Sequence, residues 1–207
     1  MQAQAAQQGR TFQLIAGDPA LDLVNTLDWR FRESGPDELM TSYDDLLDFT
    51  EQNGMLTTRQ VKILRRATNS YAANHVVEEI RGLREALSDL LYSGLDSVHS
   101  SAASLKTLER LFREAREQAR LVRDGAKLKW DWASAETKPE FPLWLLTRAA
   151  SRLLLSENVE KVRACASPEC RWLFLDTSKN HTRRWCDMKL CGNRMKARRF
   201  KASRAAD

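Results

Sequence analysis

All four cysteines of this chain of 207 residues lie near its C-terminal end, where they form two Cys-x4-Cys pairs separated by fifteen residues. Each pair can supply two thiolates from a single turn, and the segment between the pairs can fold back to bring them together. Four sulfur ligands arranged as a tetrahedron are what a structural zinc ion requires. The spacing therefore predicts one zinc ion bound by Cys165, Cys170, Cys186 and Cys191.

Two disulfide bonds are the alternative use of four cysteines, and they suit short secreted chains whose core is too small. This chain has no cysteine before residue 165, and residues 1–9 contain neither the charged nor the apolar part of a secretory signal. No run of about 18 apolar residues is present that could span a bilayer. We therefore expect a protein of the reducing cytoplasm, with thiolates that bind zinc.

Charge is distributed unevenly along the chain. Residues 161–207 contain 13 basic and four acidic side chains, a net charge of +9, whereas residues 1–160 have a net charge of −4. Basic side chains that neutralise phosphates gain free energy by releasing condensed counterions. A tail that only aids solubility is the alternative, but here the charge lies on a scaffold fixed by a metal. The asymmetry predicts a polyanionic partner, and we favour DNA.

A basic helix is expected over residues 193–206. Arg194, Arg198 and Lys201 would share one stripe of it, because they are spaced four and three residues apart. We expect Arg194 or Arg198 to reach guanine edges in a major groove, and the other basic residues to contact phosphates. The predicted DNA-binding residues are Arg183, Arg184, Lys189, Arg194, Lys196, Arg198, Arg199 and Lys201.

Between the cysteine pairs, residues 171–176 are rich in large apolar residues and a turn signal follows, which predicts a hairpin with residues 182–185 as the return strand. His181 would lie on the surface of that hairpin. A module this small needs a core beside the metal, and the aromatic residues could instead stack on unpaired bases. We favour packing. The candidate core residues are Trp172, Phe174, Trp185 and Phe200.

The same residues resemble a known family. The Cys165–Cys170 pair, the Trp-Cys dipeptide at 185–186 and the signature Cys191-Gly192-Asn193-Arg194 look like the CGNR zinc finger, over about residues 161–203. In proteins of this kind the finger follows a helical region, the ABATE domain, and residues 21–26 (Leu-Asp-Leu-Val-Asn-Thr) resemble the motif near its start. The resemblance implies a bacterial-type, stress-induced transcription regulator, with a ligand-sensing domain over residues 1–160 and a DNA-binding finger over residues 161–207.

The rest of the chain has mainly helical periodicity. Apolar residues recur three and four apart over residues 20–31, 43–52, 59–72, 75–95, 103–122 and 143–155. Residues 127–132 alternate as a strand would, and we expect them to pair with residues 12–14. The boundary near residue 160 lacks a linker, so the finger should be docked. The predicted fold is mainly α: a helical body with a small β-hairpin, followed by a treble-clef-like zinc finger with four cysteine ligands.

Catalysis is not expected. The sequence has no glycine-rich phosphate loop, no nucleophile elbow and no His-x3-His pair, and a site with four cysteine ligands leaves no open position for a substrate. Two rival functions stay open, namely an RNA-binding module and a protein-interaction finger. A homodimer is a further expectation, since one small finger is a narrow basis for specificity.

A small-molecule effector of unknown identity is a further expected partner. Asn25 and Thr26 are predicted in the middle of a helix, where a polar pair can face a pocket. Arg84, between two leucines, is a candidate counter-charge for an anionic ligand. In the alternative that we favour, Asn25 caps or bridges neighbouring helices and Arg84 is exposed.

Overall fold

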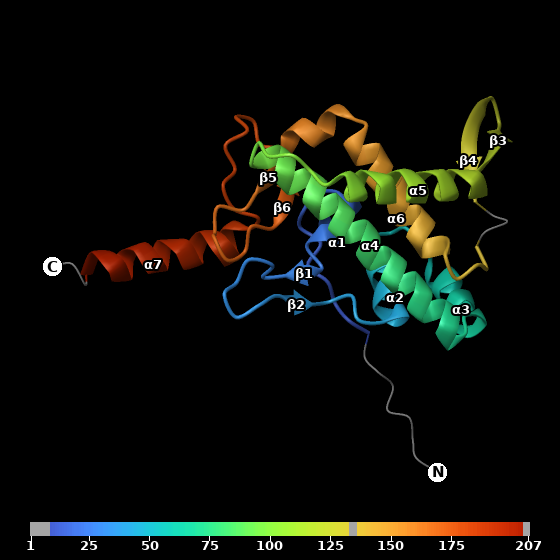
Figure 1. Cartoon of the computed structure of the whole chain (residues 1–207), viewed down its shortest axis with the longest axis horizontal. Helices are drawn as coiled ribbons and strands as arrows, with labels where there is room; N and C mark the ends of the chain where they lie inside the picture. Colours follow the sequence, from blue (N-terminus) through green and yellow to red (C-terminus); the bar gives the residue numbers. More distant parts are fainter. Residues whose placement is uncertain (1–8, 133–135, 205–207) are drawn as a thin grey trace, which may run out of the picture.

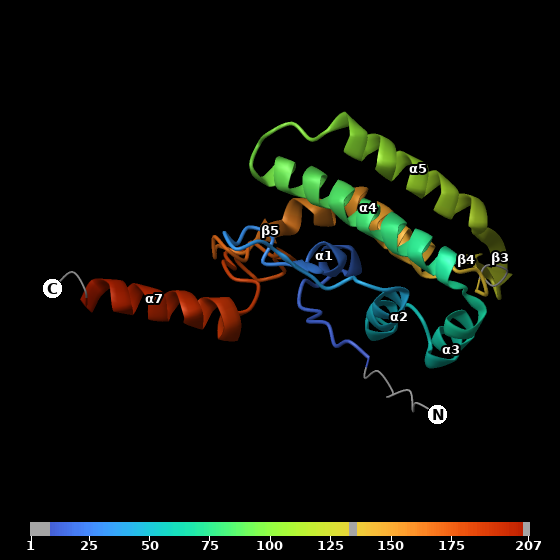
Figure 2. The same ribbon diagram turned by 60° about the horizontal axis from the view of Figure 1, so that its bottom comes forward.

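The computed structural model describes residues 9–132 and 136–204 and has a helical body from which one helix projects (Figure 1). Three long helices, α4 (Ser70–Leu95), α5 (Ala102–Gln118) and α6 (Phe141–Leu154), pack against one another. The short helices α1 (Pro19–Val24), α2 (Tyr43–Gln52) and α3 (Thr58–Ala67) complete the body, with α1 against both α4 and α6 (Figure 2). The prediction of a mainly α body is confirmed.

One continuous core joins these helices. Five of the six residues of α1 are buried, because this helix is enclosed by its neighbours on several sides. Phe12 precedes α1 and packs edge-on against Phe49 of α2, with ring centroids 5.2 Å apart. Among the largest side chains with almost no exposed surface are Leu21, Leu23, Leu46, Leu47, Phe49, Ile80, Leu83 and Leu87.

Local capping signals fix several helix starts. The Ser42 hydroxyl accepts a hydrogen bond from the backbone N–H of Asp45, whose carboxylate accepts one from the N–H of Ser42, so α2 begins with a complete capping box. Thr57 and Gln60 form the same arrangement at α3. Pro142 lies in the first turn of α6, as expected. None of the described helices combines the length and the apolar character that crossing a bilayer needs.

The predicted helix over residues 20–31 is wrong beyond Val24. Asn25 ends α1, and strand β1 (Leu27–Asp28) pairs with β2 (Asp37–Glu38) in an antiparallel ribbon. Trp29 has a left-handed backbone, with φ of 51°, which a helix cannot continue through. Trp29 and Leu39, which flank the two strands, are packed against the core, so apolar residues continue past the end of α1.

The predicted pairing of residues 127–132 with residues 12–14 is also wrong. Strand β4 (Lys127–Asp131) pairs with β3 (Arg120–Asp124), so α5 ends at Gln118 and not at residue 122. The turn between the strands contains Gly125 with φ of 62°. An Asp-Gly pair at a tight turn favours a local hairpin over a distant partner.

The finger begins with a 3-10 helix (Glu157–Lys161) and a two-stranded ribbon, β5 (Val162–Ala164) and β6 (Leu173–Leu175). Residues 182–185 are not a strand, so the predicted return strand is wrong. They belong to a loop held by Asp176, whose carboxylate accepts hydrogen bonds from the backbone N–H groups of Ser178 and Arg183. A π-helix (Met188–Gly192) then leads into α7 (Asn193–Arg204), and the last two residues of the predicted helix lie outside the described residues.

The finger is docked on the body. The Asn25 side chain donates to the Leu173 carbonyl and accepts from the Leu173 N–H, each at 2.9 Å. The Leu175 N–H donates to the Ala16 carbonyl at 2.8 Å, and the Tyr92 hydroxyl donates to the Arg171 carbonyl at 2.8 Å. Leu173, with no exposed surface, belongs to the same hydrophobic core as the body. The ribbon β5–β6 is therefore shared between the finger and the body.

Candidate metal centre and basic helix

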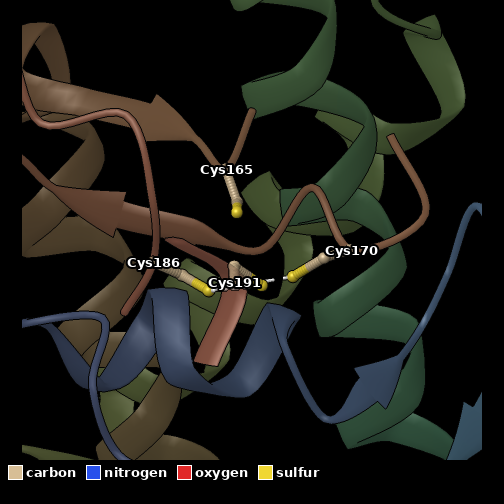
Figure 3. Close-up of side chains that lie close together, drawn as sticks. All are labelled: Cys165, Cys170, Cys186 and Cys191. Atoms are coloured by element: carbon tan, nitrogen blue, oxygen red, sulfur yellow. Dashed lines mark hydrogen bonds between the residues drawn. The ribbon is translucent and has the colours of Figure 1, made fainter. Parts of the chain in front are cut away.

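The four cysteine side chains point toward a common centre (Figure 3). All four are buried and unbridged, and their Sγ atoms lie within 4.8 Å of one another. Cys186 Sγ is 3.8 Å from Cys170 Sγ and 3.6 Å from Cys191 Sγ. A tetrahedron with zinc–sulfur bonds of about 2.3 Å has sulfur–sulfur edges of about 3.8 Å. The cluster therefore fits one structural zinc ion.

The first ligand pair follows strand β5 directly. The Cys165 N–H donates to the Trp172 carbonyl at 2.8 Å, which closes the chain segment between them into a loop. Cys170 and Arg171 both donate backbone N–H groups to the Ser167 carbonyl, so Cys170 is held in a tight turn. Arg171 leaves that turn in the left-handed conformation, with φ of 47°. The ribbon and the turn together place both sulfur atoms on the same side of the loop.

The second ligand pair is held by the start of the π-helix. The Asp187 carboxylate accepts from the Leu190 N–H at 2.9 Å and so caps this helix just after Cys186. Cys191 is buried within it. A Cβ at Gly192 would overlap the thioether of Met188, an exposed and flexible side chain, and would lie 3.3 Å from Trp185 Cδ1. A larger residue at this position of the signature would therefore require Met188 to move.

Arg194, the last residue of the signature, connects the metal centre with the body. Its Nη2 donates to Cys191 Sγ at 3.2 Å, and its guanidinium lies 4.4 Å from the centroid of the Trp29 ring. A cation beside the cluster offsets part of the negative charge of four thiolates. Burial, together with the nearby Cys165 thiolate, raises the pKa of the Cys191 thiol. Zinc binding at neutral pH therefore releases protons.

The body residues that support the finger were not predicted from the sequence. Trp29 stacks on Arg194, and the Asp28 carboxylate accepts from Trp172 Nε1 at 2.9 Å. Within the finger itself, Glu169 forms an exposed ion pair with Arg198 at 3.1 Å. The only local sign of these contacts was the presence of Asp28 and Trp29 in a segment with helical periodicity. Their partners lie far along the chain, so the contacts could not be read from that segment.

The eight basic residues predicted to bind DNA fall into two groups. Arg183, Arg194 and Arg198 are engaged inside the finger: Arg183 donates to the Trp185 carbonyl at 2.9 Å and to the Cys186 carbonyl, and its guanidinium stacks on Phe174. The other five are exposed, and none of them is ion-paired within the described part of the chain. These are Arg184, Lys189, Lys196, Arg199 and Lys201.

The predicted aromatic core is right in part. Trp172 and Phe174 are buried and Trp185 is half-buried. Phe200 is 62 % exposed on α7, so its assignment to the core is wrong. The helix extends away from the body, and no residue within it is buried (Figures 1 and 2). His181 is exposed as expected, in a left-handed turn.

The three candidate ligand residues are occupied by contacts within the chain. Asn25 bridges to Leu173 as described above, and the Thr26 hydroxyl donates to the Leu23 carbonyl at 2.7 Å. Arg84 is buried and forms two hydrogen bonds of 2.7 Å with the Glu38 carboxylate, so the alternative that left it exposed is wrong. The prediction that they bind an effector stays a prediction.

The fold and the cysteine cluster define a protein with a helical body and a structural zinc finger. Comparison with known families agrees with both parts. Residues 161–204 match the CGNR zinc finger, and residues 17–157 match ABATE, a family described as "Putative stress-induced transcription regulator". The chain therefore belongs to the ABATE family, and its C-terminal part is a CGNR zinc finger that fits one zinc ion. A search of curated proteins found no match.

Proposed function

We propose that this regulator binds duplex DNA through the zinc finger and helix α7, while the helical body senses a signal and mediates dimerisation in the cytoplasm. Catalysis has no part in the proposal. The observation that carries it is α7 itself, which holds six basic residues, no acidic residue and no buried side chain. A helix of this kind fits the width of a major groove, and its charge favours phosphate contacts.

The contacts within the finger change which residues we expect to meet DNA. Arg194 donates a hydrogen bond to Cys191 Sγ, and Arg198 forms an ion pair with Glu169. Both contacts lie in the N-terminal half of α7. Lys196 and Arg199 are three residues apart and lie on the opposite side of the helix, where both are exposed. We expect these two residues to make the main contacts and Arg194 to orient the helix that carries them. Lys201, which shares the stripe of Arg194 and Arg198 but is exposed nearer the end of the helix, is expected to contact phosphate.

One observation favours single-stranded RNA as a second candidate. Phe200 is exposed among the basic residues of α7, with the Arg204 guanidinium 5.6 Å from its ring centroid. An exposed aromatic ring beside cations can stack on an unpaired base. In that case Phe200, rather than the buried Trp172, is the stacking residue.

The test is a titration of duplex DNA with the zinc-loaded, full-length protein over a series of salt concentrations. For five or so phosphate contacts, log K should fall with log salt with a slope of about −4 to −6. A double variant, Lys196→Gln with Arg199→Gln, loses two phosphate contacts, so its slope should be less negative by about 2. The matched control is Lys62→Gln with Arg66→Gln on α3, which removes the same charge from another exposed helix.

Absence of binding at low salt, or equal effects of the two double variants, would overturn the proposal and leave the finger as a protein-docking element. Preference for single-stranded RNA that is lost in Phe200→Ala would establish the second candidate. Dimerisation is checked separately by sedimentation, in which a homodimer has twice the chain mass of 23.7 kDa.

A further inference from the structure

A cavity of about 590 Å³ lies in the helical body, between α5, α6 and the β3–β4 hairpin. Its volume is typical of small-molecule sites, which span roughly 300 to 1,000 Å³. Its apolar lining includes Phe112 and Ala115 of α5, Trp130 of the hairpin and Trp132 just after it. The hairpin and α7 are at opposite ends of the molecule (Figure 1), so this cavity is separate from the finger.

Two buried polar groups in the cavity wall have no hydrogen-bond partner among the described residues. They are the Thr147 hydroxyl and the Trp132 indole N–H, on residues that are 1 % and 8 % exposed. A threonine within a helix commonly donates to the carbonyl four residues earlier. Thr50 and Thr107 do so, at 2.8 Å and 3.0 Å, but Thr147 does not. Burying such groups unpaired costs stability, so a ligand that accepts from both is the expected compensation.

The charges around the cavity are all of one sign. Arg113, Arg116 and Arg148 line it, and none of the described residues that line it is a carboxylate. None of these three residues forms an ion pair within the part of the chain that the structure describes, whereas Arg65 and Arg110 are each paired with two carboxylates. Guanidinium groups bind carboxylates with two parallel hydrogen bonds. The opening therefore favours an anion.

The apolar surface of the cavity is mostly aromatic. Trp130 and Trp132 are two residues apart on β4 and just beyond it, so both side chains face the same side of the hairpin. Phe112 of α5 lines the cavity with them. Flat rings pack well against such a surface.

From these observations we infer that the cavity is a binding site for an aromatic carboxylate. The ring lies against Phe112 and the two tryptophans, the carboxylate pairs with Arg148 and its neighbours, and polar atoms accept from Thr147 and Trp132. The inference does not rest on DNA binding, because the ligand is measured on the protein alone.

The experiment uses indole-3-acetate and naphthalene-2-carboxylate, each with its uncharged primary amide as a matched ligand. Calorimetry on the full-length, zinc-loaded protein should show binding of an anion with a Kd below about 1 mM. Binding of the amide should be about tenfold weaker, since a hydrogen-bonded charge pair is lost. Arg148→Gln should weaken binding of the anion to a similar degree. Arg66, which is also exposed, is the control, and Arg66→Gln should leave the affinity unchanged.

Thr147→Val separates a ligand site from a structural role. It should weaken anion binding, yet leave the melting temperature of the free protein unchanged or raise it, because an unpaired buried hydroxyl is removed. Thr50→Val is the control: it removes a hydroxyl that is bonded to Leu46 and should lower the melting temperature without affecting the ligand.

Three binding results would overturn the inference. They are no binding of either anion, equal binding of anion and amide, or unchanged binding in Arg148→Gln and Thr147→Val. A loss of thermal stability in Thr147→Val equal to that in Thr50→Val would also overturn it, since the hydroxyl would then have a partner inside the protein.

Discussion

Helices α4 and α7 are held in place by different means. Ten of the 26 residues of α4 are buried, so its position is fixed by the core along most of its length. None of the 12 residues of α7 is buried, and an isolated helix of that length is marginal in water. Its position depends on its N-terminal end, where the preceding π-helix carries Cys191 of the cysteine cluster and Arg194 of the first turn stacks on Trp29. The body is stabilised by packing, whereas α7 is stabilised by the contacts at its N-terminal end.

Removal of zinc should have the largest effect, and it should affect the stability of α7 far more than that of α4. Structural zinc contributes on the order of 10 to 16 kcal/mol to isolated finger peptides. Chelation, or Cys191→Ser, should therefore disorder the two cysteine loops and α7, while the buried part of α4 stays folded. Hydrogen exchange measured by mass spectrometry gives both regions at once. Equal loss of protection in α4 and α7 would show that the body has no stability of its own.

Asn25→Ala should have the next largest effect, because it removes two of the buried hydrogen bonds that link the body to the finger. Both groups of the Leu173 backbone would lose a buried partner, at about 1 to 3 kcal/mol each. Urea unfolding should show this loss in the zinc-loaded protein and a smaller one after chelation. Asn53→Ala, which removes one bond to Phe49 inside the body, should cost the same in both states. If Asn25→Ala cost the same with and without zinc, and Asn53→Ala did not, Asn25 would not link the finger to the body.

Asp22 makes the stability of the body depend on pH. Burial raises the pKa of this carboxyl to about 6, and the hydrogen bond from the Ala16 N–H only partly opposes that shift. The unfolded chain has a pKa near 3.9. The folded state therefore holds the proton more tightly, and stability from this group falls as pH rises from about 4 to about 6, then stays level.

The size of this effect is about 2 to 3 kcal/mol, from a shift of about two units. Asp22→Asn should remove that dependence, which is measured as the difference between variant and wild-type urea unfolding at pH 4, 5, 6 and 7. A difference that does not vary over this range would show that the carboxyl is not perturbed. The zinc site should keep its metal at pH 7 in the variant.

Arg194→Lys should have the smallest effect on stability, about 1 kcal/mol, since the charge stays while the planar stack on Trp29 and the guanidinium hydrogen bond to Cys191 Sγ are lost. Thermal unfolding of the finger, followed by cobalt absorption in the cobalt-substituted protein, measures it. The affinity of this variant for different DNA sequences distinguishes two roles of Arg194. Equal weakening on all sequences supports an orienting residue, whereas relaxed preference at one base position supports our original expectation of base contact.

The zinc ligands and the helix starts could be predicted because their determinants are local. The cysteine spacing needs only the chemistry of the metal, and the capping boxes at Ser42 and Thr57 join residues three apart. The exposure of most basic residues on α7 followed from their charge.

The contacts between the finger and the body could not be predicted from local patterns. Trp29 lies within the predicted helix but has a left-handed backbone, and its ring contacts Arg194, which is distant in the sequence. Strand β6 pairs with β5 rather than with residues 182–185, because Asp176 holds the following loop away from the ribbon. The β3–β4 hairpin is different, since its Asp-Gly turn was a local signal that we assigned to the wrong partner strand.

The attachment of α7 at a single end has a mechanical consequence. At about 1.5 Å per residue, its twelve residues extend roughly 18 Å beyond the root. A rotation of about 10° at the first turn would thus displace the far end by about 3 Å, close to the rise of one base pair. Trp29, which touches that first turn, belongs to the loop between β1 and β2 of the body. Small movements of this loop are therefore amplified at the tip of the helix.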